Sequence, residues 1–226
     1  MTRLLNRAAW IESVRLLATG VFPNQDMGRG VYQITSEGEV LEDSLVFRSA
    51  PTFSAPPVAV LRNDTTPEGW RIARILAADS VAANIAEFGY DTKGIAIDSV
   101  TPDKRWAHTI FGIAPGGRSR AGWLPVSDSS RVQWWPDLFM LYGNLSVDST
   151  LRIFPHRGAP GPGERVPWPS YDVRSDTIDG EWMRVTIRVP EVFCADKVDA
   201  PQTYIRWIRW RDARGRPTVF YWTRGC

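Results

Sequence analysis

Residues 43–51 read Asp-Ser-Leu-Val-Phe-Arg-Ser-Ala-Pro, and residues 148–160 begin Asp-Ser-Thr-Leu-Arg-Ile-Phe-Pro and end Arg-Gly-Ala-Pro. Each run is followed downstream by an acidic turn that leads into a Trp-bearing strand, Asp-Lys-Arg-Trp at 103–106 and Asp-Gly-Glu-Trp at 179–182. Each copy closes on a further Trp-bearing strand, Ala-Gly-Trp-Leu-Pro-Val at 121–126 and Tyr-Ile-Arg-Trp-Ile-Arg-Trp at 204–210. A pattern that recurs in this order predicts two copies of one supersecondary unit.

The residues of the repeat resemble a bacterial SH3-like (SH3b) domain. The resemblance rests in the first copy on Leu45, Arg48, Ala50, Pro51, Trp106, Gly122 and Trp123. The second copy departs from it, because an extra segment separates Arg-Gly-Ala-Pro from Leu151, and Ile205-Arg206-Trp207 stands in place of Gly-Trp. The resemblance covers strands within residues 40–226 and none of residues 1–30. It implies small β-barrels that bind ligands, and it implies no chemistry.

The expected fold class is therefore all-β, with two tandem SH3-like small β-barrels, an N-terminal helix and a short inserted helix. We expect a helical leader at 1–30, a first barrel at 31–128, an ordered connector at 129–142 and a second barrel at 143–226. The connector contains Trp134-Trp135-Pro136 and is too apolar for a flexible linker, which favours docked barrels. The Ala-rich stretch 77–88 has apolar residues at helical spacing and predicts the inserted helix.

Elsewhere the chain reads as short strands separated by turn residues, as in small all-β folds. The expected strands of the first barrel are Val31–Ile34, Ser44–Arg48, Val58–Leu61, Trp70–Leu76, Gly94–Val100, Trp106–Ile113 and Gly122–Val126. Near the C-terminus, 204–211 and 217–222 predict a β-hairpin, in which Gly215 supplies the positive φ of the turn.

Composition excludes several function classes. The charge is nearly balanced, with 27 basic and 25 acidic residues, so no general attraction to polyanions follows. Eleven Trp residues fit small barrels, whose limited cores are filled by bulky aromatic side chains. No apolar run reaches the length of a membrane span. The segment 3–19 has helical spacing, which fits a basic membrane-surface helix or a helix packed on the first barrel, and a disordered leader is the remaining alternative.

The two cysteines, Cys194 and Cys226, both lie in the second copy, and we expect them to form a disulfide. Together with the resemblance, this placement favours a periplasmic or secreted protein. The N-terminus is a poor signal peptide, because Glu12 and Arg15 interrupt its apolar stretch. We therefore expect a signal, if the protein is exported, to lie upstream of Met1.

No catalytic or cofactor motif supports an enzyme. The two histidines, His108 and His156, are isolated, neither cysteine opens a helix as catalytic cysteines of wall peptidases do, and the acidic residues fit solvated turns. No metal-ligand spacing, phosphate-binding loop or EF-hand pattern occurs, so we expect no cofactor and no metal.

The favoured function is a non-enzymatic binding or scaffold protein of the bacterial cell envelope that recognises a cell-wall peptide or glycan, or an envelope protein partner. By resemblance, the expected ligand-binding residues are Arg48, Pro51, Trp106, Trp123, Phe154, Trp168, Trp182 and Trp207. Two alternatives stay open. One is a cytoplasmic nucleic-acid-binding protein that uses the Arg- and Trp-rich C-terminal hairpin, although strand alternation divides its arginines between two faces and makes nucleic acid the less expected partner. The other is an accessory or inhibitor domain of a wall hydrolase.

Overall fold

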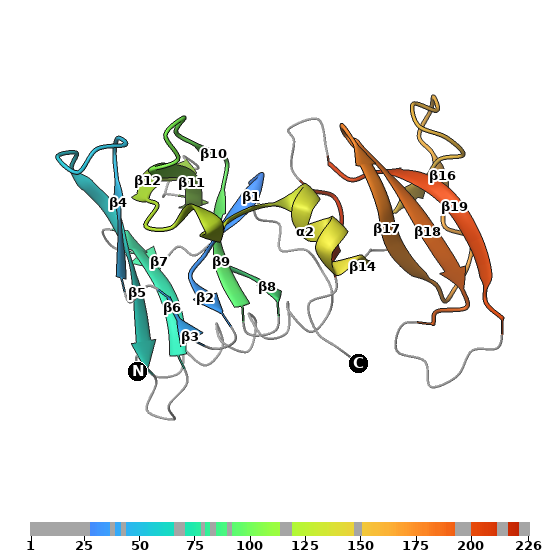
Figure 1. The fold of residues 1–226 in the computed structure, drawn as a ribbon, viewed down its shortest axis with the longest axis horizontal. Coiled ribbons are helices and arrows are strands. Elements are labelled where there is room, and N and C mark those ends of the chain that lie inside the picture. The colour runs from blue at the N-terminus through green and yellow to red at the C-terminus, as the bar shows by residue number, and fades with distance from the viewer. Residues whose placement is uncertain are drawn as a thin grey trace.

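The structure of the 226-residue chain is a computed structural model. It describes residues 28–36, 39–41, 44–65, 71–77, 80–81, 85–89, 92–113, 119–146, 151–192, 200–211 and 217–221. The described residues form a predominantly β fold, as the sequence predicts, with a helix between two groups of strands (Figure 1). The predicted N-terminal helix falls in residues that lie outside the described ranges, apart from the last three residues of the leader.

We call the strands before this helix the first unit. They are β1 (Gly30–Gln33), β2 (Thr35–Ser36), β3 (Glu39–Val40), β4 (Ser44–Arg48), β5 (Pro57–Thr65), β6 (Arg71–Ala77), β7 (Ser80–Val81), β8 (Ile85–Gly89), β9 (Thr92–Ile97), β10 (Ser99–Val100), β11 (Trp106–Ile113), β12 (Ser119–Pro125) and β13 (Val132–Trp134). The strands after the helix, the second unit, are β14 (Asn144–Ser146), β15 (Arg152–Ile153), β16 (Glu164–Arg165), β17 (Asp172–Asp179), β18 (Trp182–Val189), β19 (Gln202–Arg209) and β20 (Phe220–Tyr221).

Two antiparallel sheets make up most of the first unit. One has the order β13-β1-β9-β8 and the other the order β10-β11-β12-β4-β5-β6-β7. The chain crosses between these sheets more than once, and at the crossing from β9 to β10 the backbone N–H of Asp98 donates to the carbonyl of His108. The buried side chains come from both sheets, so the sheets share one core: Tyr32, Ile34, Leu45, Phe47, Ala59, Leu61, Ile75, Ile95, Ile97, Ala107 and Leu124.

Alternation of exposed and buried side chains explains strand β4. In β4 the inward-facing Leu45 and Phe47 are buried, whereas Ser44, Val46 and Arg48 are more exposed. The predicted bounds 44–48 and 106–113 are confirmed as β4 and β11. A period of two places every second side chain on the core face, which is the pattern that a half-buried strand requires.

The helix predicted at 77–88 is wrong. Ala77 ends β6, residues 80–81 form β7, and residues 85–88 belong to β8. β7 pairs with β6 through Leu76 and Val81, and β8 pairs with β9 through Ile85 and Ile95. These hydrogen-bonded pairings with neighbouring strands outweigh the helical preference of an Ala-rich stretch.

The expected connector, 129–142, belongs in part to the first unit. It contains η1 (Ser129–Arg131), β13, which pairs with β1, and α2 (Trp135–Tyr142), whose first turn holds a proline. The first unit thus extends beyond the predicted boundary at 128. Trp135, Leu138 and Phe139 of α2 are buried together with Val31 of β1 and with residues of the second unit. The helix therefore joins the two units through a shared core, and Figure 1 shows it between them.

The second unit contains a five-stranded sheet of order β19-β18-β17-β14-β20 and a two-stranded sheet formed by β15 and β16. Its core side chains are Leu145, Leu151, Ile153, Val173, Met183, Val185, Ile187, Ile208, Trp210 and Val219. The sheets in the described ranges do not close into a barrel.

The predicted C-terminal hairpin is correct only beside its turn. Arg211 bridges to Pro217, and the N–H of Thr218 donates to the carbonyl of Trp210. Beyond these contacts the two predicted arms separate. The described end of the second arm, β20, pairs with β14 at the edge of the sheet opposite β19. Gly215 and the rest of the turn lie outside the described ranges.

Candidate ligand-binding site

The two units share one arrangement of strands around the repeated Trp residues. In the first, Trp106 of β11 pairs with Pro125 of β12, and the next position pairs Ala107 with Leu124. In the second, β18 and β19 show the same register, which pairs Trp182 with Arg209 and Met183 with Ile208. Ala107, Leu124, Met183 and Ile208 are all fully buried. We call each such pair of strands, with the turn that leads into it, a Trp hairpin.

The turn before each Trp hairpin also matches. Lys104, with φ 57°, and Gly180, with φ 63°, both stand two residues before the Trp in the left-handed region. In both units, the carbonyl of the following residue accepts a hydrogen bond from the residue directly after the closing strand. Val126 N–H donates to the carbonyl of Arg105, and Trp210 N–H donates to the carbonyl of Glu181. Gly180 takes this conformation without strain, whereas Lys104 does so at some cost. The acidic-turn motif therefore encodes the same local backbone twice.

The first strand of each repeat lies beside the closing strand. Arg48 of β4 pairs with Trp123 of β12, and Phe154, directly after β15, bridges to Trp207 of β19. In the described ranges each of these contacts is a single pair of residues. The order first strand, closing strand, Trp strand is thus common to both units.

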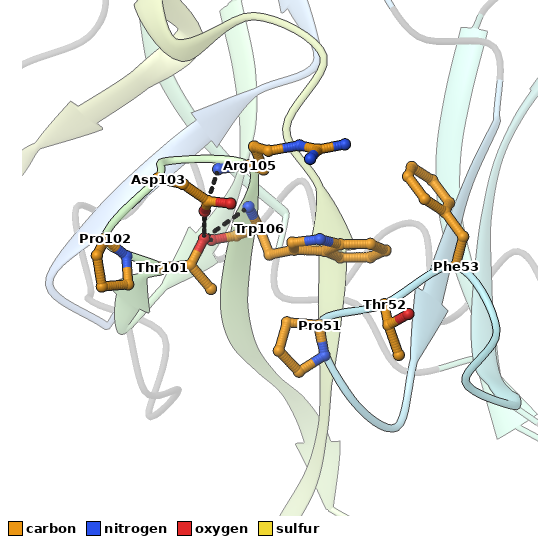
Figure 2. Close-up of a pocket in the computed structure, with 8 residues that line it drawn as sticks. All are labelled: Pro51, Thr52, Phe53, Thr101, Pro102, Asp103, Arg105 and Trp106. Carbon is orange, nitrogen blue, oxygen red and sulfur yellow. Dashed lines mark hydrogen bonds between the residues drawn. The ribbon is translucent and has the colours of Figure 1, made fainter.

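A pocket of about 400 Å³ lies against the Trp hairpin of the first unit. It is lined by Pro51, Thr52, Phe53, Thr101, Pro102, Asp103, Arg105 and Trp106 (Figure 2). Phe53 is 62% exposed and its ring centroid lies 4.9 Å from that of Trp106, which is only 5% exposed. The pocket therefore has a fixed aromatic wall and a second aromatic ring that remains open to solvent.

The polar side of this pocket is organised around Asp103. Its Oδ1 accepts from the Thr101 hydroxyl at 2.5 Å and from the backbone N–H of Arg105 at 3.1 Å. The Thr101 hydroxyl oxygen in turn accepts from the Trp106 backbone N–H at 3.1 Å. Chiefly the Thr101 hydrogen bond, and then that of Arg105, hold the pKa of Asp103 below its ordinary value of 3.8. Asp103 is thus a fixed carboxylate at neutral pH.

Of the predicted binding residues in the first unit, Pro51 and Trp106 line the pocket. Arg48 and Trp123 are not among the residues that line it. The Arg48 guanidinium donates to the carbonyl of Ala55 at 2.7 Å and so holds the loop that carries Phe53. Trp123 packs on the ring of His108, with centroids 4.9 Å apart. Arg48 thus supports a loop that lines the pocket, and Trp123 does not line it.

The matching position in the second unit is filled by the chain itself. Phe154 and Trp182 meet edge to face with centroids 5.0 Å apart, and both are buried together with Ala159. The Arg209 guanidinium lies 4.9 Å from the Trp182 ring, and Trp207 packs against the cluster. Arg157 forms an ion pair with Asp179, the acid three residues before Trp182.

Trp168, the remaining predicted residue, lies apart from this cluster. Its ring stacks on that of Tyr204 with centroids 4.3 Å apart, and both side chains pack against the core of the second unit. The structure therefore brings Phe154, Trp182 and Trp207 together and leaves Trp168 outside the group.

The sequence prediction missed Phe53, Thr101, Asp103 and Arg105. Signals for them were present, because Phe53 follows the Arg-Ser-x-Pro run and the other three belong to the acidic turn before Trp106. Neither run by itself shows that the two loops face each other across one pocket.

The Arg- and Trp-rich segment does not present its described aromatic rings for stacking. Trp210 is 3% exposed, and its indole N–H donates to the carbonyl of Gly180. Trp207 packs on Phe154 and Trp182, and it lies on the same face of the strand as Arg209. Arg214, Arg216, Trp222 and Arg224 lie outside the described ranges.

Cys194 and Cys226 also lie outside the described ranges, so their pairing stays a prediction. In the part of the chain that is described, no group of three or more His, Cys, Asp or Glu side chains is placed to hold a metal ion. Nor does a helix there combine the length and apolar character needed to cross a membrane.

Comparison of the chain with protein-family models, with curated proteins and with solved structures finds no match in any of the three.

Proposed function

We propose that this protein is a non-enzymatic binding module of the bacterial cell envelope, built from two SH3-like units, and that the pocket of the first unit holds its ligand. The observation that carries the proposal is the pocket between Phe53, Trp106 and the acidic turn. It lies where the resemblance to SH3-like domains places a ligand groove, and two residues expected from the sequence, Pro51 and Trp106, line it.

The size and lining of the pocket support this proposal. A volume of about 400 Å³ lies at the lower end of the range of small-ligand sites, which combine apolar walls with a few placed polar groups. Here the walls are Pro51, Phe53 and Trp106, and the polar groups are Thr101, Asp103 and Arg105. A short peptide of a cell-wall fragment or of an envelope protein fits such a site better than a flat macromolecular surface does.

The shape of the site also leads us to expect weak binding. Much of Phe53 is exposed, so the ligand desolvates a shallow surface and gains little from enclosure. Since the second site is filled by Phe154, we expect one ligand per chain rather than two sites acting together.

Co-sedimentation with purified cell-wall fragments tests the proposal. The full chain should sediment with the fragments and release no soluble muropeptides, and Phe53→Ala should lose most of the bound fraction. Ile205→Ala is the matched control, because Ile205 is 59% exposed and belongs to the second unit. Equal retention of both variants, or release of muropeptides by the wild-type chain, would overturn the proposal. Salt-sensitive binding to single-stranded DNA without affinity for the wall would favour the nucleic-acid alternative instead.

A further inference from the structure

The charged groups of the first pocket define the ligand chemistry more narrowly. We infer that this pocket takes a zwitterionic group, with its cationic end at Asp103 and its anionic end at Arg105, above the apolar surface formed by Pro51, Phe53 and Trp106. The inference rests on the proposed function, since it specifies the ligand of the same pocket.

The acidic end is a carboxylate with one oxygen in use. Both hydrogen bonds to Asp103 reach Oδ1, from the Thr101 hydroxyl and from the Arg105 backbone N–H. Among the described residues, no ion pair or hydrogen bond involves Oδ2. The turn therefore holds the carboxylate in place and leaves an acceptor for a donor from outside the chain. An ammonium or guanidinium group is the donor that gains most from an ionised acceptor.

The basic end is the Arg105 side chain. It is exposed, lines the pocket, and forms no ion pair within the part of the chain that is described. Figure 2 shows its guanidinium directed away from Asp103, on the side toward Phe53, with the Trp106 indole extending along the same direction. In that view Asp103 lies beside one end of the Trp106 side chain, and the Arg105 guanidinium lies above the indole, between Asp103 and Phe53. A ligand with a single charge would meet one attractive and one repulsive end, whereas a dipolar ligand satisfies both.

In the second unit, the acidic and aromatic side chains at the matching positions are already paired within the chain. There the acid three residues before the Trp, Asp179, is paired with Arg157. The Arg209 guanidinium lies over the Trp182 ring, and the Phe154 and Trp182 rings meet edge to face. In the first unit, Pro125 occupies the pairing position of Arg209 and provides no cation. The first pocket therefore lacks internal partners that the second has, and an external ligand can supply them.

Four forms of one dipeptide separate the two charges in a titration of the full chain followed by NMR. The probes are alanyl-alanine with free ends, its N-acetyl form, its amide, and the form capped at both ends. An exposed ion pair contributes modestly, so each cap should weaken binding about two- to five-fold. A fifth probe, N-acetyl-lysyl-glutamyl amide, separates free peptide ends from charged side chains as the source of the dipole.

Charge-neutral variants assign each end. Asp103→Asn retains an Oδ1 acceptor for Thr101 and Arg105, and it should remove the difference between the free and acetylated amine while keeping the preference for a free carboxylate. Arg105→Gln should remove the preference for a free carboxylate while keeping the difference between the free and acetylated amine. Lys104→Gln is the matched control, because Lys104 is an exposed cation in the same turn that does not line the pocket.

The outcomes distinguish this inference from the proposed function. Equal affinity for all the probes, no binding of any of them, or a ranking that Asp103→Asn and Arg105→Gln leave unchanged would overturn the zwitterion assignment. If such a result is accompanied by loss of wall binding in Phe53→Ala, the proposed function as a binding module is retained and only the zwitterion assignment is rejected. Tighter binding of the Lys-Glu probe than of free alanyl-alanine would assign the dipole to side chains within a longer chain.

Discussion

Truncating Phe154 to Ala should destabilise the protein far more than truncating Phe53 to Ala. Both rings contact the Trp of their own unit, with centroids 5.0 Å apart for Phe154 and Trp182 and 4.9 Å apart for Phe53 and Trp106. They differ in burial, since Phe154 is 4% exposed and Phe53 is 62% exposed. The comparison therefore measures how completely each unit fills its own site.

The expected magnitudes follow from this difference in burial. Removing a buried Phe side chain costs about 3–5 kcal/mol in the free energy of unfolding, which includes the cavity left behind. Only part of the Phe53 side chain is buried, so its removal should lower the free energy of unfolding by about 1 kcal/mol, through lost transfer energy and the lost ring contact. The two variants should thus differ by about 2–4 kcal/mol, a shift on the order of 1–2 M in the urea midpoint.

Urea unfolding followed by circular dichroism gives these free energies, and the m-value checks that each variant unfolds from a comparable native state. Phe154→Leu serves as a milder variant if Phe154→Ala does not fold, and it should lie between the wild type and the range above. Equal destabilisation at the two positions, or a larger loss at Phe53, would refute the assignment of an open first site and a filled second one.

Three further predictions concern the framework and the pocket. Arg188→Ala should cost about 2 kcal/mol in urea unfolding, because Asp172 is 8% exposed and its Oδ1 accepts from Arg188 Nε at 2.7 Å; a loss below about 0.5 kcal/mol would contradict this. Gly163→Ala should destabilise by more than Gly158→Ala, since both have positive φ but only at Gly163 would a Cβ meet the Phe154 ring, at 2.7 Å; equal losses would count against the packed loop. Thr101→Val should raise the pKa of Asp103 toward 3.8 in an NMR titration, because it removes the main hydrogen bond to the carboxylate, so the charge persists to lower pH in the wild type than in the variant.

The sequence predicted the elements whose signal is local. Strand β4 follows from alternation, and the turns before Trp106 and Trp182 follow from their shared acidic motif. The stretch 77–88 misled because its Ala content favours a helix locally, whereas its strands pair with β6 and β9. The position of β20 could not be predicted either, since its partner β14 lies far away in the sequence.

The residues of the candidate site also fall into two groups, those that the sequence motif indicates and those that only the fold brings together. Pro51 and Trp106 could be found because they belong to the repeated motif. Phe53 and Asp103 come from two separate loops, and only the fold brings those loops to one pocket. The filled state of the second site depends on the packing of Phe154 and Arg209 around Trp182, which motif similarity between the copies does not reveal.

Indole NMR of the full chain during titration with soluble cell-wall fragments tests the central claim most directly. The indole N–H resonances of Trp106 and Trp182 can be assigned with the single variants Trp106→Phe and Trp182→Phe. We predict a saturable shift of the Trp106 resonance with no change at Trp182, because only the first pocket is open to a ligand. A shift at Trp182 or Trp207 that leaves Trp106 unchanged would contradict the account.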